Sequence, residues 1–116
     1  MAARQSSAIR VEHVVGEPVL VLAGDLDVRS TAQVRDAVHD HIRECGTDLI
    51  SPVVIDISDV GSVDATALKM LAAASRQAQR YGVRVVLRGA QPAVRRMLHL
   101  THLIRLIELE REPIPA

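Results

Sequence analysis

The sequence predicts an α/β domain built on a mixed β-sheet of four or five strands with covering helices, in the order ββαβαβα. Short runs rich in Val, Ile and Leu alternate along the chain with longer segments whose apolar residues recur at helical spacing. The connections are short, and no repeat or low-complexity stretch divides the 116 residues, a usual size for one domain. We expect residues 9–110 to form this domain, with flexible ends at 1–8 and 111–116.

The composition limits the classes of partner. Fourteen Lys and Arg residues balance fourteen Asp and Glu residues, and Tyr81 is the one aromatic residue besides the histidines. A neutral chain without Phe or Trp has neither a basic surface for phosphate backbones nor a platform on which bases stack. We therefore expect no nucleic-acid partner.

The cysteine content and the apolar segments favour a cytoplasmic protein. Cys45 is the one cysteine, so an internal disulfide is excluded and a reducing compartment is expected. The first residues lack the apolar stretch of a signal peptide, and no segment approaches the roughly 20 apolar residues that span a bilayer. We expect no membrane insertion, and a monomer or a weak dimer.

The first strands and the first helix follow from local patterns. Residues 9–15 and 18–23 predict a hairpin with a turn at 16–18, and the second strand is apolar throughout, so it should lie deeper in the sheet. A helix should begin at Ser30 or Thr31 and run to about Glu44. Its inward stripe is expected at positions 32 or 34, 37 or 38, and 41 or 42.

Residues 53–57 predict the central strand, because this β-branched run is apolar on both faces. Residues 61–62 then read as a loop. Asp64 should cap a second helix that runs to about Tyr81. The helical period gives this helix an inner face of Leu68, Leu71, Ala72, Ser75 and Ala78, and an outer face of Thr66, Lys69, Met70, Ala73, Gln77 and Arg80.

The last third of the chain predicts a strand at 83–88 and a third helix that begins at Pro92, with Val94, Met97 and Leu98 buried. Residues 103–109 form a short hydrophobic ending, which we interpret as an edge strand.

No pattern of catalytic or metal-binding residues is present. The five histidines lack any recognised ligand spacing, and the chain contains no Gly-x-Ser-x-Gly elbow and no glycine-rich phosphate loop. We therefore expect no enzymatic activity, no cofactor and no metal site. The remaining candidates are four acids at strand ends, Asp25, Asp27, Asp59 and Asp64, for which capping of a turn or helix is the structural alternative to a binding role.

The order of four motifs resembles the STAS domain family, in particular the bacterial anti-sigma factor antagonists. Residues 24–27 (Gly-Asp-Leu-Asp) resemble the family's Gly-Glu-Leu-Asp signature, and residues 54–60 resemble its Asp-Leu-Ser strand end. Residues 64–68 (Asp-Ala-Thr-Ala-Leu) stand where Asp-Ser-Ser-Gly-Leu is usual, and residues 92–101 resemble its last helix. The resemblance covers residues 9–109 and implies a mixed sheet covered by helices.

The resemblance also implies a function. Such a domain binds an anti-sigma factor of the ATP-binding, kinase-like type and frees a sigma factor to direct transcription. The kinase then phosphorylates the first Ser of the Asp-Ser-Ser-Gly motif, which ends the interaction. Here that position is Ala65, which has no hydroxyl, and Thr66 is the alternative acceptor. We therefore expect an antagonist-like module without the usual serine switch.

The partner surface is predicted from the motifs and from the helical period. It combines the acids at the strand ends with the outer face of the second helix, which places apolar residues beside charged ones: Asp25, Asp27, Asp64, Ala65, Thr66, Lys69, Met70 and Ala73. Two other functions fit the same pattern, namely a STAS subunit that binds the ATPase of a lipid-transport complex, and a sensor module that binds a nucleotide or another ligand.

Overall fold

The structure is a computed structural model and describes residues 10–13, 18–46 and 51–110. Its elements are β1 (Arg10–His13), β2 (Val19–Leu26), α1 (Thr31–Cys45), β3 (Val53–Val63), α2 (Ala65–Arg80), β4 (Val85–Arg88), α3 (Pro92–Leu100), the 3-10 turn η1 (Leu103–Arg105) and β5 (Glu108–Leu109). The order ββαβαβα is confirmed, and the predicted edge strand is present as β5.

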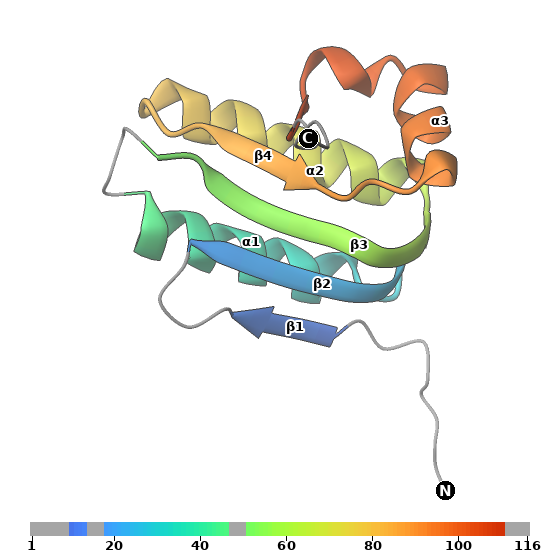
Figure 1. Ribbon diagram of the computed structural model, residues 1–116, viewed down its shortest axis with the longest axis horizontal. Helices are drawn as coiled ribbons and strands as arrows, with labels where there is room; N and C mark the ends of the chain where they lie inside the picture. Colours follow the sequence, from blue (N-terminus) through green and yellow to red (C-terminus); the bar gives the residue numbers. More distant parts are fainter. Residues whose placement is uncertain (1–9, 14–17, 47–50, 111–116) are drawn as a thin grey trace, which may run out of the picture.

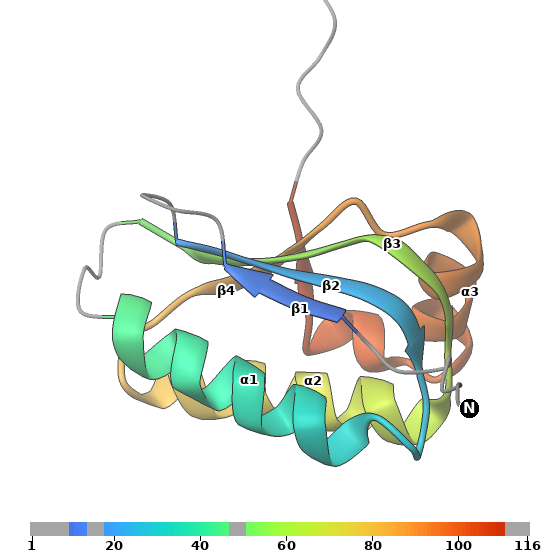
Figure 2. The same ribbon diagram turned by 90° about the horizontal axis from the view of Figure 1, so that it is seen from below.

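The five strands form one sheet in the order β1-β2-β3-β4-β5 (Figure 1). β1 runs antiparallel to β2, and the other neighbours are parallel. Figure 2 shows α1 and α2 side by side on one face of the sheet, with α3 at the end where β2 and β3 curve toward the helices. The predicted hairpin is confirmed by the β1–β2 pairing, while most of its turn lies outside the described residues.

The interior position of β3 is confirmed, and both of its faces are buried. Val53, Ile55 and Ile57 are at most 1% exposed and belong to the main core beneath α1 and α2. Val54 points the opposite way and packs with Val19 and Val86 on the other face of the sheet. Apolar side chains on alternating faces are therefore the reason that this strand lies in the middle.

The strand β3 is longer than predicted, and the expected loop at residues 61–62 is wrong. Pairing with β2 continues to Val63 and is interrupted by two irregularities. The first lies between Asp56 and Asp59, which pair with Val21 and Ala23. The second lies between Val60 and Ser62, whose partners are consecutive residues of β2. At each point β3 carries one residue more than β2, as in a β-bulge, which bends a strand and increases its twist. β2 likewise extends three residues beyond the predicted end, to Leu26.

The bulges explain why the pattern was misread. Ser58, Asp59, Gly61 and Ser62 are exposed, so the segment has the composition of a loop, although its backbone still pairs with β2. Opposite this segment Gly24 has φ 115°, a conformation that glycine adopts without steric cost. The bulges depend on backbone pairing between strands, which hydrophobic periodicity does not report.

The first helix forms as predicted. Ser30 is its N-cap, and Val34, Val38 and His41 make its buried stripe. The Nε2 atom of His41 lies 3.2 Å from the carbonyl oxygens of both Pro18 and Val54. This buried histidine thus joins α1 to β2 and β3, and its polar edge is hydrogen-bonded as a buried polar group requires.

The predicted inner face of α2 is confirmed, because Leu68, Leu71, Ala72, Ser75 and Ala78 are all buried. The assignment of Met70 to the exposed face is wrong. Met70 is half-buried and packs against the core, and Ala67 and Ala74 beside it on the helix are buried. Residues at i, i+3 and i+7 share one face, so the buried face is wider than the predicted stripe.

The strand β4 begins two residues later than predicted. The amides of Gly82 and Val83 donate to the carbonyls of Gln79 and Ala78, which completes the end of α2, and Gly82 has φ 79°.

Pro92 occupies the first turn of α3 as predicted, with Val94 and Leu98 buried. Among the described residues, no helix has the length and apolar character needed to cross a membrane.

Candidate functional site

The predicted site lies at the edge of the sheet where β2 and β3 both end. The two strands are parallel and Leu26 is paired with Val63, so the residues that follow them, Asp27 and Asp64, lie at the same edge. The amide of Asp64 donates to the carbonyl of Leu26 at 3.0 Å. This hydrogen bond attaches the start of α2 directly to the end of β2.

Asp64 caps α2 as predicted. Its backbone is extended, with φ −104° and ψ 169°, and its Oδ1 accepts the amide of Ala67 at 2.8 Å. The amide of Leu68 donates to the carbonyl of Asp64 at 3.1 Å. The carboxylate therefore satisfies an otherwise unpaired N–H group and lies at the positive end of the helix dipole.

Ala65 is the first residue of α2 and is half-buried, whereas Thr66 is exposed. Successive helical residues point about 100° apart, so the threonine hydroxyl does not occupy the direction of the missing serine. Lys69 and Ala73 are also exposed. The first turn of α2 carries no acidic residue, so within the helix start itself the capping Asp64 supplies the negative charge that faces the positive end of the dipole.

Asp25 belongs to the same edge through a contact that the sequence did not predict. Its Oδ1 accepts the hydroxyl of Ser62 at 2.8 Å, and the two residues are paired across β2 and β3. Ser62 was assigned to a loop, so this interaction could not be found from local patterns. The hydrogen bond orients an exposed carboxylate beside the start of α2.

Asp27 is not a free carboxylate. Its Oδ1 accepts the amide of Arg29 at 2.9 Å, and its Oδ2 accepts Nη2 of the same residue at 2.6 Å. These hydrogen bonds with the arginine side chain, and then with its amide, hold the pKa of Asp27 below its ordinary value of 3.8. Asp27 is therefore ionised at neutral pH, with its charge partly compensated by a neighbour that sequence reasoning did not weigh.

Two hydroxyl groups close the turn between β2 and α1 by hydrogen bonds to its backbone carbonyls. The Ser30 hydroxyl lies 3.0 Å from the carbonyl of Asp25 and 3.2 Å from that of Asp27, and the Thr31 hydroxyl donates to the latter at 2.8 Å. Within this turn Val28 is 71% exposed. An apolar side chain between two charged residues in a turn was the signal that could have identified it as a surface residue.

The structure gathers some of the predicted site residues and separates others. Asp25, Asp27, Asp64 and Ala65 lie at one edge of the sheet, whereas Met70 is partly turned into the core. Ala73 lies eight residues along α2, about 12 Å from Ala65. Of the predicted acids, Asp59 is exposed on the bulged part of β3. In the part of the chain that the structure describes, no three potential metal ligands are grouped.

The chain belongs to the STAS domain family, because a family model described as "Mlab, STAS domain" matches residues 9–108. No curated protein sequence matches it.

Known structures share this fold. An anti-sigma factor antagonist from Mycobacterium paratuberculosis is 25% identical with a TM-score of 0.68, over 90% of this chain and 85% of that one. The unphosphorylated form of the antagonist SpoIIAA, the Bacillus cell fate determinant, is 18% identical with a TM-score of 0.64, over 90% and 89%. The murine anion transporter Slc26a9 is 20% identical with a TM-score of 0.58, over 79% of this chain and 16% of that one.

Proposed function

We propose that the protein is a regulatory antagonist of an anti-sigma factor in the bacterial cytoplasm. It binds an anti-sigma factor of the ATP-binding, kinase-like type and so frees a sigma factor to direct transcription. Membership of the STAS family and the similarity to anti-sigma factor antagonists support this general role. The role is one of binding, without catalysis, cofactor or metal, and the protein acts as a monomer or weak dimer.

The observation that carries the proposal is the capped start of α2. The Asp64 carboxylate accepts the Ala67 amide of the first turn at 2.8 Å, and Asp25 and Asp27 lie at the same edge of the sheet. The motifs that contain these three residues resemble those of the antagonists. The proposed contact surface, here called the α2 surface, comprises residues predicted from the sequence and the exposed turn residue Val28: Asp25, Asp27, Val28, Asp64, Ala65, Thr66, Lys69, Met70 and Ala73.

The proposed complex is not controlled by phosphorylation of a serine. Ala65 stands at the acceptor position and has no hydroxyl. Thr66 is exposed, but its hydroxyl points about 100° around the helix from the acceptor direction. The partner is therefore released by another route, such as competition or a change in its concentration.

Charge reversal tests the α2 surface. The partner is first captured from the native cytosol and identified by mass, and its affinity is then measured by calorimetry. We expect Lys69→Glu to weaken binding about tenfold, because a like charge is introduced within an acidic surface. Arg80→Glu is the matched control, since Arg80 is an exposed cation at the far end of the same helix. Equal affinity of the wild type and the Lys69 variant would place the interface elsewhere.

Asp27→Lys is expected to weaken binding too, although it also removes the ion pair with Arg29. Arg29→Gln separates these effects, because it leaves the carboxylate and removes its partner. If Asp27 contacts the anti-sigma factor, the Asp27 variant loses more affinity than the Arg29 variant. Equal losses would assign the effect to the shape of the turn.

A second candidate is a STAS subunit that binds the ATPase of a transport complex through the same surface. It is supported by the name of the matching family model and by the presence of this fold in a transporter. The capture experiment distinguishes the two, because a kinase-like anti-sigma factor and a transport ATPase differ in mass and sequence. Sigma and kinase genes beside the gene would favour the antagonist, and permease and ATPase genes the transport subunit.

A further inference from the structure

A groove lies between the C-terminal halves of α1 and α2, at the opposite end of α2 from the proposed partner surface. Its volume is about 380 Å³, within the range of about 300–1,000 Å³ that is usual for small-molecule sites. Tyr81 on its wall lies 16 residues beyond Ala65, which corresponds to about 24 Å along the helix axis. The groove therefore shares no residue with the α2 surface, although Ala73 of that surface is next to Ala74 in α2.

The apolar part of the groove lining comes from both helices and from the segment that follows α2. Ile42 comes from α1, Ala74 and Ala78 from α2, and Val83 from the segment that follows. The two alanines are buried, so α2 offers no large side chain to fill the space beside Ile42. An apolar group bound against these residues would remove their surface from water.

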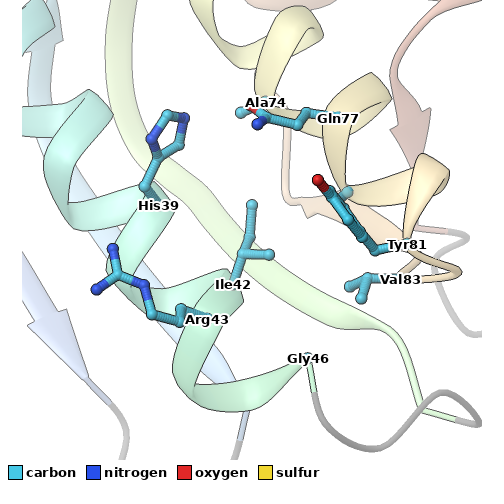
Figure 3. Close-up of a pocket in the computed structure, with 9 residues that line it drawn as sticks. His39, Ile42, Arg43, Gly46, Ala74, Gln77, Tyr81 and Val83 are labelled. Carbon is cyan, nitrogen blue, oxygen red and sulfur yellow. The ribbon is translucent and has the colours of Figure 1, made fainter.

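Tyr81 supplies one wall of the groove. It is the only residue among Phe, Trp and Tyr in the chain, yet 74% of its surface is exposed. Figure 3 shows its ring and Ile42 on opposite sides of the groove. An aromatic ring of this kind prefers an offset or edge-on contact with a second ring. Its position outside the core thus favours a ligand that contains a ring.

The polar groups around the groove favour an anion. His39, Gln77 and the phenol of Tyr81 lie around it (Figure 3), and the contacts described for the structure give their side chains no hydrogen-bond partner. Among the described residues that line the groove, none is Asp or Glu. Arg43 also lines it and pairs with Asp40 at 3.2 Å, but both side chains are exposed, so reorientation of the guanidinium costs little.

We propose that this groove binds a small planar molecule that carries one anionic group. Its ring lies between Tyr81 and Ile42, and its anionic group accepts hydrogen bonds from Gln77 and the cationic side chain of Arg43. The proposal goes beyond the binding of an anti-sigma factor and does not depend on it, because the groove shares no residue with the α2 surface.

The test uses three probes of similar size, followed by the backbone amide signals of the full chain in NMR titrations. 2-Naphthoate carries both the aromatic ring system and the anion. 2-Naphthylmethylammonium keeps the ring system with a positive charge, and decahydro-2-naphthoate keeps the anion on a saturated two-ring frame. We expect naphthoate to bind at least about twofold more tightly than the saturated carboxylate, the lower limit of an aromatic contact. It should also bind more tightly than the ammonium probe, whose positive charge is repelled by Arg43. The shifted signals should belong to the C-terminal halves of α1 and α2.

Two pairs of variants assign the contacts. Tyr81→Ala should lose at least about twofold in naphthoate affinity. Leu100→Ala, a change at an exposed apolar residue of α3 that does not line the groove, should lose none. Arg43→Gln should reduce the preference for naphthoate over the ammonium probe, and Arg35→Gln on the same helix should not. Binding of the ammonium probe as tight as naphthoate, unchanged affinity of the Tyr81 variant, shifts centred at the start of α2, or no saturable binding below about 1 mM would each overturn the proposal.

Discussion

The two halves of β3 show how one strand serves the fold and the site. In the half formed by residues 53–57, residues 54–56 pair with β2 in regular register and residues 53–56 pair with β4. Residues 58–63 pair only with β2, through two irregularities, and most of their side chains are exposed. The first half is therefore stabilised by packing on both faces. The second half is stabilised by its pairing with one neighbour and by Val60, which is buried in the main core.

The difference has a structural consequence. The bulged half bends toward the helical layer, as Figure 2 shows, and delivers Asp64 to the start of α2. The polar side chains on this half are then free to orient site residues, as Ser62 does for Asp25. The buried half of the strand anchors it in the core. The polar half can then carry the site residues at the surface without exposing the core.

The largest effect is expected in the buried half. Ile55 is 1% exposed within the main core, so Ile55→Ala should lower the free energy of unfolding by about 2–5 kcal/mol. Asp59→Ala in the exposed half is the control and should change it by less than about 0.5 kcal/mol. Urea unfolding measures both. A cost below about 1 kcal/mol at Ile55 would mean that the two halves do not differ as described.

The next effect concerns binding at the end of the polar half. Ala65→Glu should weaken the anti-sigma factor complex at least tenfold, about 1.4 kcal/mol, because it adds a negative charge beside Asp25, Asp27 and Asp64. A Glu in the first turn of a helix is favourable for folding, so the free energy of unfolding should not fall. Calorimetry and urea unfolding of the same variant separate these contributions.

The same position tests the missing switch. Incubation with the cognate kinase and ATP should leave the wild type at its unmodified mass with the complex intact, and Ala65→Ser should gain one phosphate. A phosphate there would interact favourably with the free N–H groups of α2 but would add about −1.5 to −2 charges to the surface. Stoichiometric phosphate on Thr66 of the wild type, with release of the partner, would contradict the proposal that phosphorylation does not control the complex.

The contrast between the halves of β3 also explains what the sequence could predict. The buried half and the inner face of α2 depend on apolar residues at periods of 2 and 3.6, which can be read directly. The bulged half, the Asp25–Ser62 contact and the groove depend on pairing between segments far apart in the chain. Met70 was misplaced for a related reason, since the width of a buried helix face depends on its neighbours.

A smaller effect is expected at the cap that follows the polar half. Asp64→Ala removes the hydrogen bond to the Ala67 amide and should lower the free energy of unfolding by about 1 kcal/mol. Asp64→Asn keeps an oxygen acceptor and is the control, with a loss well under that value. If both variants lost the same amount, the charge of Asp64 rather than its capping hydrogen bond would stabilise the start of α2.

The smallest effect is expected at the boundary between the halves, where Asp56 is paired with Arg88 of β4. Arg88 donates to Glu110 at 2.6 and 3.0 Å and holds the pKa of this carboxyl below its ordinary value of 4.5. The unfolded chain therefore takes up this proton first as the pH falls, so the stabilisation is present above the ordinary pKa and is lost as the pH falls through the lower, folded value.

Arg88→Gln tests this contribution. At pH 7 it should cost at most about 1 kcal/mol, because both partners are partly exposed and water screens the pair. Between about pH 5 and pH 3 the gap between the wild type and the variant should close, since protonation of Glu110 removes the same interaction from the wild type. Arg96→Gln, at an exposed position of α3, is the control, and its free energy of unfolding should change with pH in parallel with that of the wild type. Urea unfolding across this range decides the point: a gap that stays constant with pH would mean that Arg88 stabilises the boundary by packing of its aliphatic stem and not by its charge.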